Sequence, residues 1–290
     1  EMTDYYKDKQ WTLDDDAEIT PFTDGSSAGF RIKRRYLDST ICQTVRLYSV
    51  NRRIDFETDI DWYQKHQILK AAFPFDVNTN EATYEIQFGH VTRPTHANTS
   101  WEQAKFEVYG HKWVDMSENG YGIALLNDCK YGHAIHEGIM SLTILKCGTF
   151  PDPDADKCEH VFTYSLFPHA GDYREAGTIK KAYDLNIPML CKKVGENKGN
   201  LANEYSFFTI DQDNIIFETA KKAETEDSII LRGCEYYNKR TTANIKFGFN
   251  VKKAYLCDML ENNIQELDVV DNTVTVDFKP FEINTIKIIK

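Results

Sequence analysis

The chain has none of the features that define several large classes of protein. No apolar run among its 290 residues reaches the roughly 18 residues of a membrane-spanning helix. Internal repeats and low-complexity tracts are also missing, which argues against a solenoid or a disordered segment. We therefore expect a globular protein, long enough for one large hydrophobic core or two smaller ones.

Basic residues are too few for a partner with a phosphate backbone. The sequence has 34 lysine and arginine residues against 45 aspartate and glutamate residues, and its net charge is −11. Basic clusters at 31–35 and 52–53 lie beside or among acidic residues, which is typical of a solvated surface. Nucleic-acid-binding domains present a basic face, so we expect no nucleic-acid partner.

Cysteine usage gives no disulfide framework. The seven cysteines, an odd number, are scattered without a repeating spacing. This usage is typical of reduced thiols, and we expect a cytoplasmic protein. The phosphate-binding loop, the dinucleotide fingerprint and the Gly-x-Ser-x-Gly elbow of hydrolases are absent as well.

What the sequence does contain is hydrophobic alternation with a period of two. Ile54, Phe56, Thr58, Ile60 and Trp62 alternate with acidic residues, which predicts a strand with one buried and one wet face. The same pattern predicts buried Tyr84, Ile86 and Phe88 against solvent-facing Glu85 and Gln87, and another strand around Val274 to Phe278. Similar runs fall at 41–50, 106–115, 121–127, 161–167, 229–237, 243–250 and 285–289. Many short strands between Gly, Pro and Asn clusters predict an all-β, antiparallel sandwich.

One helix and one linker complete this organisation. Residues 172–185 have apolar residues at roughly helical spacing, with Asp172 as N-cap and Pro188 shortly beyond the end. The polar, glycine-containing run 192–200 is the best linker candidate. We therefore predict a large β-sandwich over 1–190 and a small C-terminal β-sandwich over 200–290.

The stretch from Gln87 to Gly132 is the most distinctive part of the chain. It contains QFGHVTRPTHANTSWE, then FEVYGHKWVD, then YGIALLNDCKYG. These segments resemble the C-terminal region of family 38 glycoside hydrolases, the retaining α-mannosidases, and most closely the cytosolic and bacterial branch. The likeness extends in order along most of the chain, with matches at Asp4-Tyr-Tyr, Arg46-Leu-Tyr, Arg53-Ile-Asp55, Asp61-Trp62, Phe73-Pro74, Pro151 to Asp156, Pro168-His169 and Leu231-Arg232.

The resemblance implies a galactose mutarotase-like supersandwich for the large domain, whose first strands can begin upstream of Glu1. It also implies hydrolysis of terminal α-mannosidic bonds in oligosaccharides, with a carboxylate nucleophile and a second carboxyl group as general acid. The family's nucleophile and zinc ligands belong to an N-terminal α/β domain, so the resemblance assigns no catalytic residue and no metal to this chain. The expected partners are that N-terminal catalytic domain of the same polypeptide and a mannosyl oligosaccharide.

The sequence departs from the family pattern at Leu145-Lys146-Cys147, where Leu-Arg-Ser is usual. A lysine point charge does not replace an arginine fork at a bidentate contact. We therefore carry over no sugar contact or interdomain contact to position 146.

What remains for this chain is the rim of a sugar site. Asn127, Asp128, Lys130 and Tyr131 bring an amide, a carboxylate, an ammonium and a phenol to a predicted strand end. Those groups suit a carbohydrate's hydroxyls, and we predict a substrate-binding rim there. The alternative is a purely structural turn, in which Asn127 and Asp128 bond their own backbone.

Two groups imitate metal sites. His133 and His136, with Cys129 and Glu137 nearby, lack the second pair of ligands that a tetrahedral zinc site needs. Asp152, Asp154 and Asp156 resemble the start of a calcium loop, but Lys157 and Thr163 replace the glycine and glutamate such a loop requires. We interpret the first group as structural and the second as an acidic surface loop.

Five aromatic and cationic residues are expected to be partly buried, in packing or interdomain contacts. They are Arg93, His96, Trp101, His111 and Trp113. We further expect the surface around Trp101, Trp113 and 127–133 to be covered by the catalytic domain in the whole protein, and an isolated chain to dimerise or to be poorly soluble.

Two other functions remain open. An autonomous carbohydrate-binding module would bind sugar by itself. A mutarotase-like sugar epimerase would need a His and Glu pair in a concave sheet, which His90 or His111 with Glu107 could supply.

Overall fold

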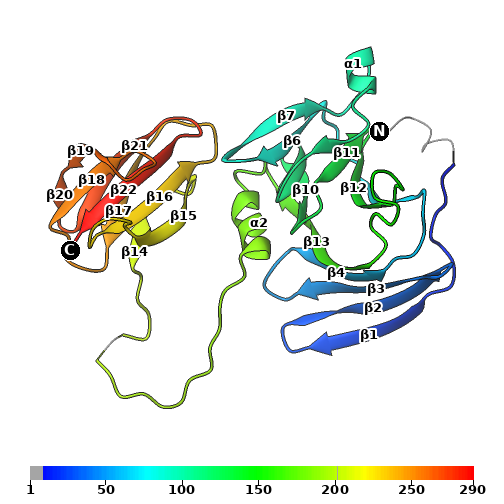
Figure 1. The fold of residues 1–290 in the computed structure, drawn as a ribbon, viewed down its shortest axis with the longest axis horizontal. Helices are drawn as coiled ribbons and strands as arrows, with labels where there is room; N and C mark the ends of the chain where they lie inside the picture. Colours follow the sequence, from blue (N-terminus) through cyan, green and yellow to red (C-terminus); the bar gives the residue numbers. More distant parts are fainter. Residues whose placement is uncertain (1–8, 201) are drawn as a thin grey trace. The chain divides into compact units, whose positions relative to one another are not determined.

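The computed structural model describes residues 9–200 and 202–290, so the Asp4-Tyr-Tyr match lies outside the described part. The described chain is built almost entirely of antiparallel strands, with two short helices (Figure 1), and the all-β prediction is confirmed. It divides into two compact units, one with residues up to Ile86 and Val91–Met189, the other with Gln87–His90 and Leu190–Lys290. None of the described helices is long and apolar enough to cross a membrane.

A nine-stranded sheet forms the larger part of the first unit. Its strands follow the order β1-β2-β3-β4-β13-β10-β9-β6-β7. Four of them, in sequence order, make the antiparallel meander that Figure 1 draws in blue. The bounds are β1 Glu18–Asp24, β2 Ser27–Tyr36, β3 Ser39–Tyr48, β4 Ile54–Asp61, β6 Glu81–Ile86, β7 Gly89–Pro94, β9 Trp113–Glu118, β10 Tyr121–Asn127 and β13 Glu159–Ala170.

A four-stranded sheet packs against one face of the nine-stranded sheet. Its order is β5-β12-β11-β8, with bounds β5 Ile68–Pro74, β8 Val108–Tyr109, β11 Gly132–His136 and β12 Ile139–Lys146. The core between the two sheets is apolar because inward positions alternate along each strand. Members from the large sheet are Ile60, Tyr84, Val114, Met116, Ile123 and Leu125, and members from the small one are Ile135, Met140, Leu142 and Ile144.

The opposite face of the large sheet is covered near its centre by the segment after β13. The helix α2, Thr178–Asn186, contacts β9 and β10. The ring of Trp113 on β9 stacks on Tyr173 at 5.0 Å between centroids. Because both faces are covered here, nearly every residue of β10 is buried, whatever its direction.

The predicted helix over 172–185 begins too early. Asp172 does not cap α2: its Oδ1 accepts from the backbone amides of Arg174 and Glu175, which closes a turn ahead of the helix. Gly177, in a left-handed conformation, separates that turn from Thr178. The prediction of Asp172 as N-cap was therefore wrong, because its carboxylate closes the turn that precedes the helix.

The second unit is a smaller sandwich that follows an exposed connecting segment. Residues 187–200 have no helix or strand and are all exposed. Two sheets follow, in the orders β14-β17-β21-β20 and β15-β16-β22-β18-β19, around a core that includes Leu231, Ile245, Val274, Phe278 and Ile286. The bounds are β14 Phe208–Ile210, β15 Ile215–Lys222, β16 Ile229–Glu235, β17 Thr241–Phe247, β18 Lys253–Cys257, β19 Asn263–Leu267, β20 Val269–Val270, β21 Thr273–Phe278 and β22 Ile283–Ile289.

Three positions of the predicted alternation are wrong. Asp55 and Glu85 were expected on wet faces, but both are buried. Phe88 was expected in the core, but it is exposed and sits at a positive φ of 55° in the turn after β6. The period of two holds along both strands, but in the covered centre of the sheet the second face is not solvent.

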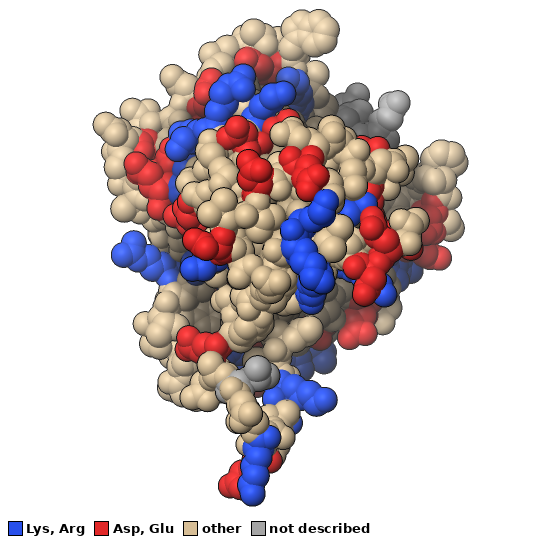
Figure 2. All heavy atoms as spheres, turned by 90° about the vertical axis from the view of Figure 1, so that its left-hand side faces the viewer, with Lys and Arg blue, Asp and Glu red and all other residues tan. Residues whose placement is uncertain are grey.

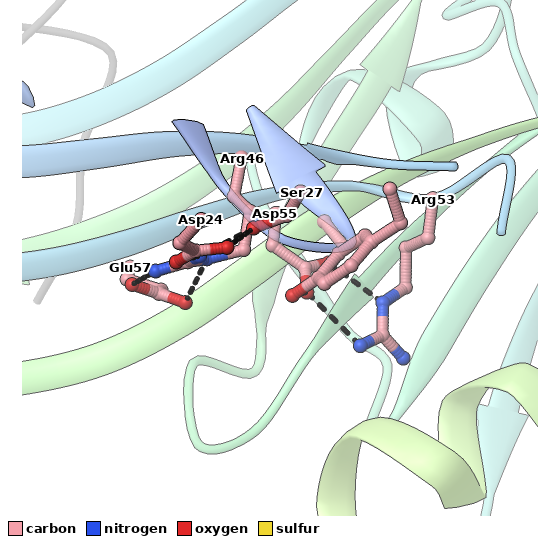
Figure 3. Close-up of polar contacts among 8 residues, drawn as sticks. Asp24, Ser27, Arg46, Arg53, Asp55 and Glu57 are labelled. Carbon is pink, nitrogen blue, oxygen red and sulfur yellow. Dashed lines mark hydrogen bonds and ion pairs between the residues drawn. The ribbon is translucent and has the colours of Figure 1, made fainter. Parts of the chain in front are cut away.

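Asp55 is stabilised in that buried position by a set of polar partners. The Arg53 guanidinium forms a bidentate ion pair with Asp55 at 2.6 and 2.9 Å (Figure 3). Hydroxyls of Tyr48 and Ser165 donate to its oxygens at 2.7 and 2.6 Å. Burial, and secondarily the Asp55 carboxylate, raises the pKa of Tyr48 to about 12.

A second buried pair crosses the middle of the same sheet. Asp115 on β9 and His169 on β13 face each other over β10, with His169 Nε2 2.7 Å from Asp115 Oδ2. Ser117 Oγ donates to the other oxygen of Asp115. Burial by itself would lower the pKa of His169, but the hydrogen bond and charge of Asp115 outweigh it and raise that pKa. Gly122 on β10 leaves the space through which the imidazole reaches, because a Cβ there would overlap His169 and Ser117.

We expect Gly122→Ala to destabilise the first unit. The added methyl group must displace the imidazole or the Ser117 hydroxyl, and overpacking of this kind costs about 1–3 kcal/mol of unfolding free energy. Urea unfolding of the variant beside wild type measures the loss. Gly148→Ala is the matched control, since a Cβ there meets nothing within 4 Å. Equal stability of the two variants would contradict this account.

The stabilising effect of the Asp115–His169 pair should decrease as pH rises. A histidine whose folded-state pKa is raised contributes stability that is complete below its unfolded pKa of about 6.5 and is lost as pH rises through the folded pKa. His169→Gln should therefore lower the unfolding free energy more at pH 6 than at pH 9. Urea melts of both proteins at the two pH values give this difference, and Asp115→Asn should abolish its pH dependence. A difference that grew with pH would show that His169 is held neutral.

Candidate functional site

The loop between β10 and β11 carries the four predicted rim residues, and it begins at a fixed point. Asn127, the last residue of β10, is fully buried. Its Nδ2 donates to the carbonyl of His111 at 2.7 Å, and its Oδ1 accepts from the amide of Lys130 at 2.8 Å. The backbone carbonyl of Asn127 accepts from Asn186 at the end of α2. Both side-chain atoms of Asn127 are thus used to shape the loop.

Asp128 ties the same loop to β13. Its amide donates to the Thr163 carbonyl at 3.1 Å, and its Oδ2 accepts from the Thr163 amide at 2.8 Å. Asp128 Oδ1 is shielded from solvent and accepts no hydrogen bond from a described residue. Lys130 lies with its ammonium 4.7 Å from the centre of the Phe162 ring, which fixes the cation above β13.

Tyr131 is the member of the four that faces outward most fully. Its side chain is 47% exposed, and its ring packs on His111 at 5.0 Å. His111 in turn packs on Tyr109, 54% exposed, at 5.9 Å. Burial, and then the charge of Lys112, lowers the pKa of His111, so its ring is neutral at neutral pH. We call Tyr109, His111 and Tyr131 the aromatic row.

The aromatic row rests on a buried ion pair that sequence reasoning missed. Lys112 Nζ lies 3.0 Å from Glu85 Oε1, and the Glu85 side chain is almost fully buried. The same ammonium lies 4.7 Å from the Tyr183 ring of α2. Glu85 was predicted on a wet face from alternation alone. The lysine 27 positions later gave no local signal of the pair.

A second surface cluster lies at one end of strands β1–β4. Arg46 bridges two carboxylates, with Asp24 at 2.6 Å and Glu57 at 2.9 Å, and also donates to Ser27 (Figure 3). These contacts raise the pKa of Arg46 and leave its charge compensated. On the face drawn in Figure 2, lysine and arginine side chains are interspersed with aspartate and glutamate.

The five residues expected to be partly buried differ in their exposure to solvent. Trp101 on α1, Ser100–Gln103, is 82% exposed, whereas Trp113 is fully buried against Tyr173. The expectation that Trp113 forms surface for the catalytic domain was therefore wrong, because the turns before α2 cover it. Arg93, His96 and His111 are partly buried as expected.

The remaining candidates are engaged within the fold. Glu107 accepts from Lys70 and Thr143, while His111 packs on Tyr131, so the structure gives each member of the predicted epimerase pair other partners. The Asp152 side chain closes a local turn, Asp154 forms an ion pair with Lys157, and Asp156 accepts from the Lys146 amide. Lys146 is exposed.

No donor set in the described ranges fits zinc. Within 9–200 and 202–290, no three His, Cys, Asp or Glu side chains lie together as metal ligands would. His133, the strongest single candidate, is fully buried, and burial lowers the pKa of its imidazole to about 3. We derive no chemical step in this chain through a metal.

Two family models match the chain. The glycosyl hydrolases family 38 C-terminal domain covers residues 1–154, and the glycosyl hydrolases family 38 C-terminal beta sandwich domain covers residues 214–286.

Curated relatives agree with the family models. Alpha-mannosidase 2C1 of Homo sapiens is 41% identical over 235 residues, which are 79% of this chain and 22% of that protein. Alpha-mannosidase G of Dictyostelium discoideum is 38% identical over 259 residues, 87% of this chain and 24% of that protein. The chain thus spans about a quarter of the length of these relatives.

A solved structure shares the fold. The crystal structure of an alpha-mannosidase from Enterococcus faecalis V583 superposes with a TM-score of 0.77 at 19% identity, over 93% of this chain and 35% of that one. This shared fold and the family model that covers more than half of the sequence together explain the order of motifs from Gln87 to Gly132. The chain belongs to glycosyl hydrolase family 38 and comprises C-terminal domains of that family.

Proposed function

We propose that this chain is the non-catalytic C-terminal part of an enzyme that hydrolyses terminal α-mannosidic bonds in oligosaccharides with retention of configuration. The nucleophile, the general acid and the zinc ion belong to an N-terminal catalytic domain of the same polypeptide, which is the chain's main partner. Support comes from the matched C-terminal family models and from the share of each relative, 22% and 24%, that the chain spans. Seven unpaired cysteines support a reducing, cytoplasmic location.

The aromatic row is the observation that supports a role in sugar binding. Exposed rings offer flat apolar faces on which the C–H face of a sugar stacks, and the Tyr131 hydroxyl and the Lys130 ammonium offer hydrogen bonds beside them. Tyr109 lies on the two-residue strand β8, and Tyr131 lies on a loop that Asn127 holds through both of its amide atoms. A surface this rigid suits the edge of a substrate site at a domain interface.

The four rim residues divide their work in this proposal. Tyr131 and Lys130 contact the oligosaccharide, and Asp128 accepts a hydroxyl at Oδ2, beside the Thr163 amide, because its Oδ1 is shielded from solvent. Asn127 holds the loop and positions the other three. An autonomous carbohydrate-binding module is the second candidate function, since the same exposed rings would serve it.

Substitutions in the rim should reduce turnover more than stability. In the full-length enzyme we expect Tyr131→Phe and Asp128→Asn each to lower kcat/KM about 2- to 10-fold, the loss of one hydrogen bond of about 0.5–1.5 kcal/mol in the transition state. Asp128→Asn retains an oxygen that can accept from Thr163, so its melting temperature should stay near that of wild type. Kinetics and thermal unfolding are measured on the same preparations.

Two matched variants serve as controls for the rim. Tyr121→Phe removes the hydroxyl of an exposed tyrosine at the opposite end of β10 and should leave kcat/KM unchanged. Asn127→Ala should lower the melting temperature, because it removes both bonds that shape the loop. Unchanged kinetics in the two rim variants, with lowered melting temperatures, would mean that the loop is only structural.

The isolated 290-residue chain should not hydrolyse aryl α-mannosides, with or without added zinc. The proposal places the nucleophile and the metal ligands outside it. Release of the aryl group is measured with a sample purified from a host lacking mannosidase. Turnover above background would refute the non-catalytic assignment. Calorimetric titration of the same sample with mannose tests the second candidate, because a module that works alone must bind sugar without the catalytic domain.

A further inference from the structure

A small, partly open cavity of the first unit is lined by cationic and imidazole groups. It has a volume of about 30 Å³ and lies between the β6–β7 hairpin, the strand β11 and the α1 segment. Its lining includes Arg93, His133, His136, Lys105 and Glu102. A space of this size holds a particle about as large as a water molecule and is too small for a sugar ring.

Arg93 is held in the lining without a counter-charge. Its guanidinium lies 4.5 Å from the centre of the Tyr84 ring and 4.8 Å from that of Tyr109. Two rings at these distances compensate the cation only in part, and its N–H groups still need acceptors. Its Nη1 is shielded from solvent and has no acceptor among the described residues.

No carboxylate among the described residues forms an ion pair with Arg93. Burial raises the pKa of Tyr84, so this phenol stays neutral. Glu102 is the carboxylate of the lining, but the Thr99 amide donates to its Oε2 at 2.9 Å in a capping box, and His96 Nδ1 lies 3.6 Å from the same oxygen. Glu85 and Glu107 are paired with Lys112 and Lys70.

His133 adds a second polar group with an unmet need. The side chain is fully buried and touches Tyr84 edge-on, its ring interacts with the Gly110 backbone, and neither ring nitrogen has a partner of close hydrogen-bond geometry among the described residues. A neutral imidazole carries one N–H donor, which can point to an anion beside the guanidinium. Water would satisfy the donors but would leave the arginine charge uncompensated in a shielded site.

We propose that this cavity binds one small monovalent anion, of chloride size, between the edge of the Arg93 guanidinium and the His133 imidazole. The anion completes the charge balance where the nine-stranded and four-stranded sheets meet at β7 and β11. It thereby stabilises the strands next to the aromatic row, since Tyr109 is one of the two rings that hold Arg93. This site is independent of the proposed sugar contact.

The first test is the melting temperature of the chain in different sodium salts at constant ionic strength. Chloride and bromide should raise it by about 2–4 °C relative to gluconate, because a ligand that binds only the folded state stabilises it. Sulfate, which is larger, should not. Arg93→Gln should abolish the halide-specific rise. Arg31→Gln is the matched control, because Arg31 is exposed and also lies over one ring, that of Phe22.

The second test locates the ion. A crystal grown in bromide should show an anomalous difference peak in the cavity, within about 3.5 Å of Arg93 Nη1. This measurement decides the matter if Arg93→Gln does not fold. A halide response that survives Arg93→Gln would overturn the proposal, and so would a bromide crystal in which the cavity holds water or the Glu102 carboxylate instead.

Discussion

The centre of the nine-stranded sheet is covered on both faces, and most of the polar architecture of the first unit follows from that constraint. A strand with one wet face can place carboxylates outward at no cost. Strands β4 and β9 cannot, because α2 and the turns before it lie over the second face, and Glu85 of β6 is covered by Lys112, whose ammonium contacts Tyr183 of α2. Each buried carboxylate there has a cationic partner: Asp55 has Arg53, Asp115 has His169, and Glu85 has Lys112. Removing one member of such a pair costs far more than the pair contributes.

These pairs also specify which strands lie side by side. The Ser165 hydroxyl of β13 reaches Asp55 of β4, and His169 of the same strand reaches across β10 to Asp115 of β9. A slip of one residue in β10 would put a side chain where Gly122 leaves space for the imidazole. The end of β10 is therefore placed accurately. The loop with Lys130 and Tyr131 begins there and brings Tyr131 against His111. The exposed rings of the aromatic row therefore depend on ion pairs that are buried beneath them.

The sequence predicted the strands well, because a period of two is a local signal and most runs keep it. The strand over 121–127 and the one beginning at Ile54 were found with their bounds nearly right. What escaped prediction was non-local. Burial of Asp55 depends on the helix α2, which lies more than a hundred residues further along the sequence. Burial of Glu85 depends on Lys112. Trp113 was expected at a surface for the same reason, since Tyr173 covers it. The family's motif order pointed to the loop at 127–131, but its exposed ring at Tyr131 and its buried amide at Asn127 can be told apart only in three dimensions.

Arg93 is the exception to the rule of paired buried charges. Every buried carboxylate discussed above has a cation within about 3 Å, in agreement with the cost of leaving a charge unpaired. Arg93 has two aromatic faces instead, and these compensate a cation only in part. A chain that balances Asp55, Glu85 and Asp115 so closely is not expected to leave the Nη1 edge of Arg93 without an acceptor. The simplest arrangement that restores the balance is a diffusible anion, because the carboxylates nearest in the fold already have partners.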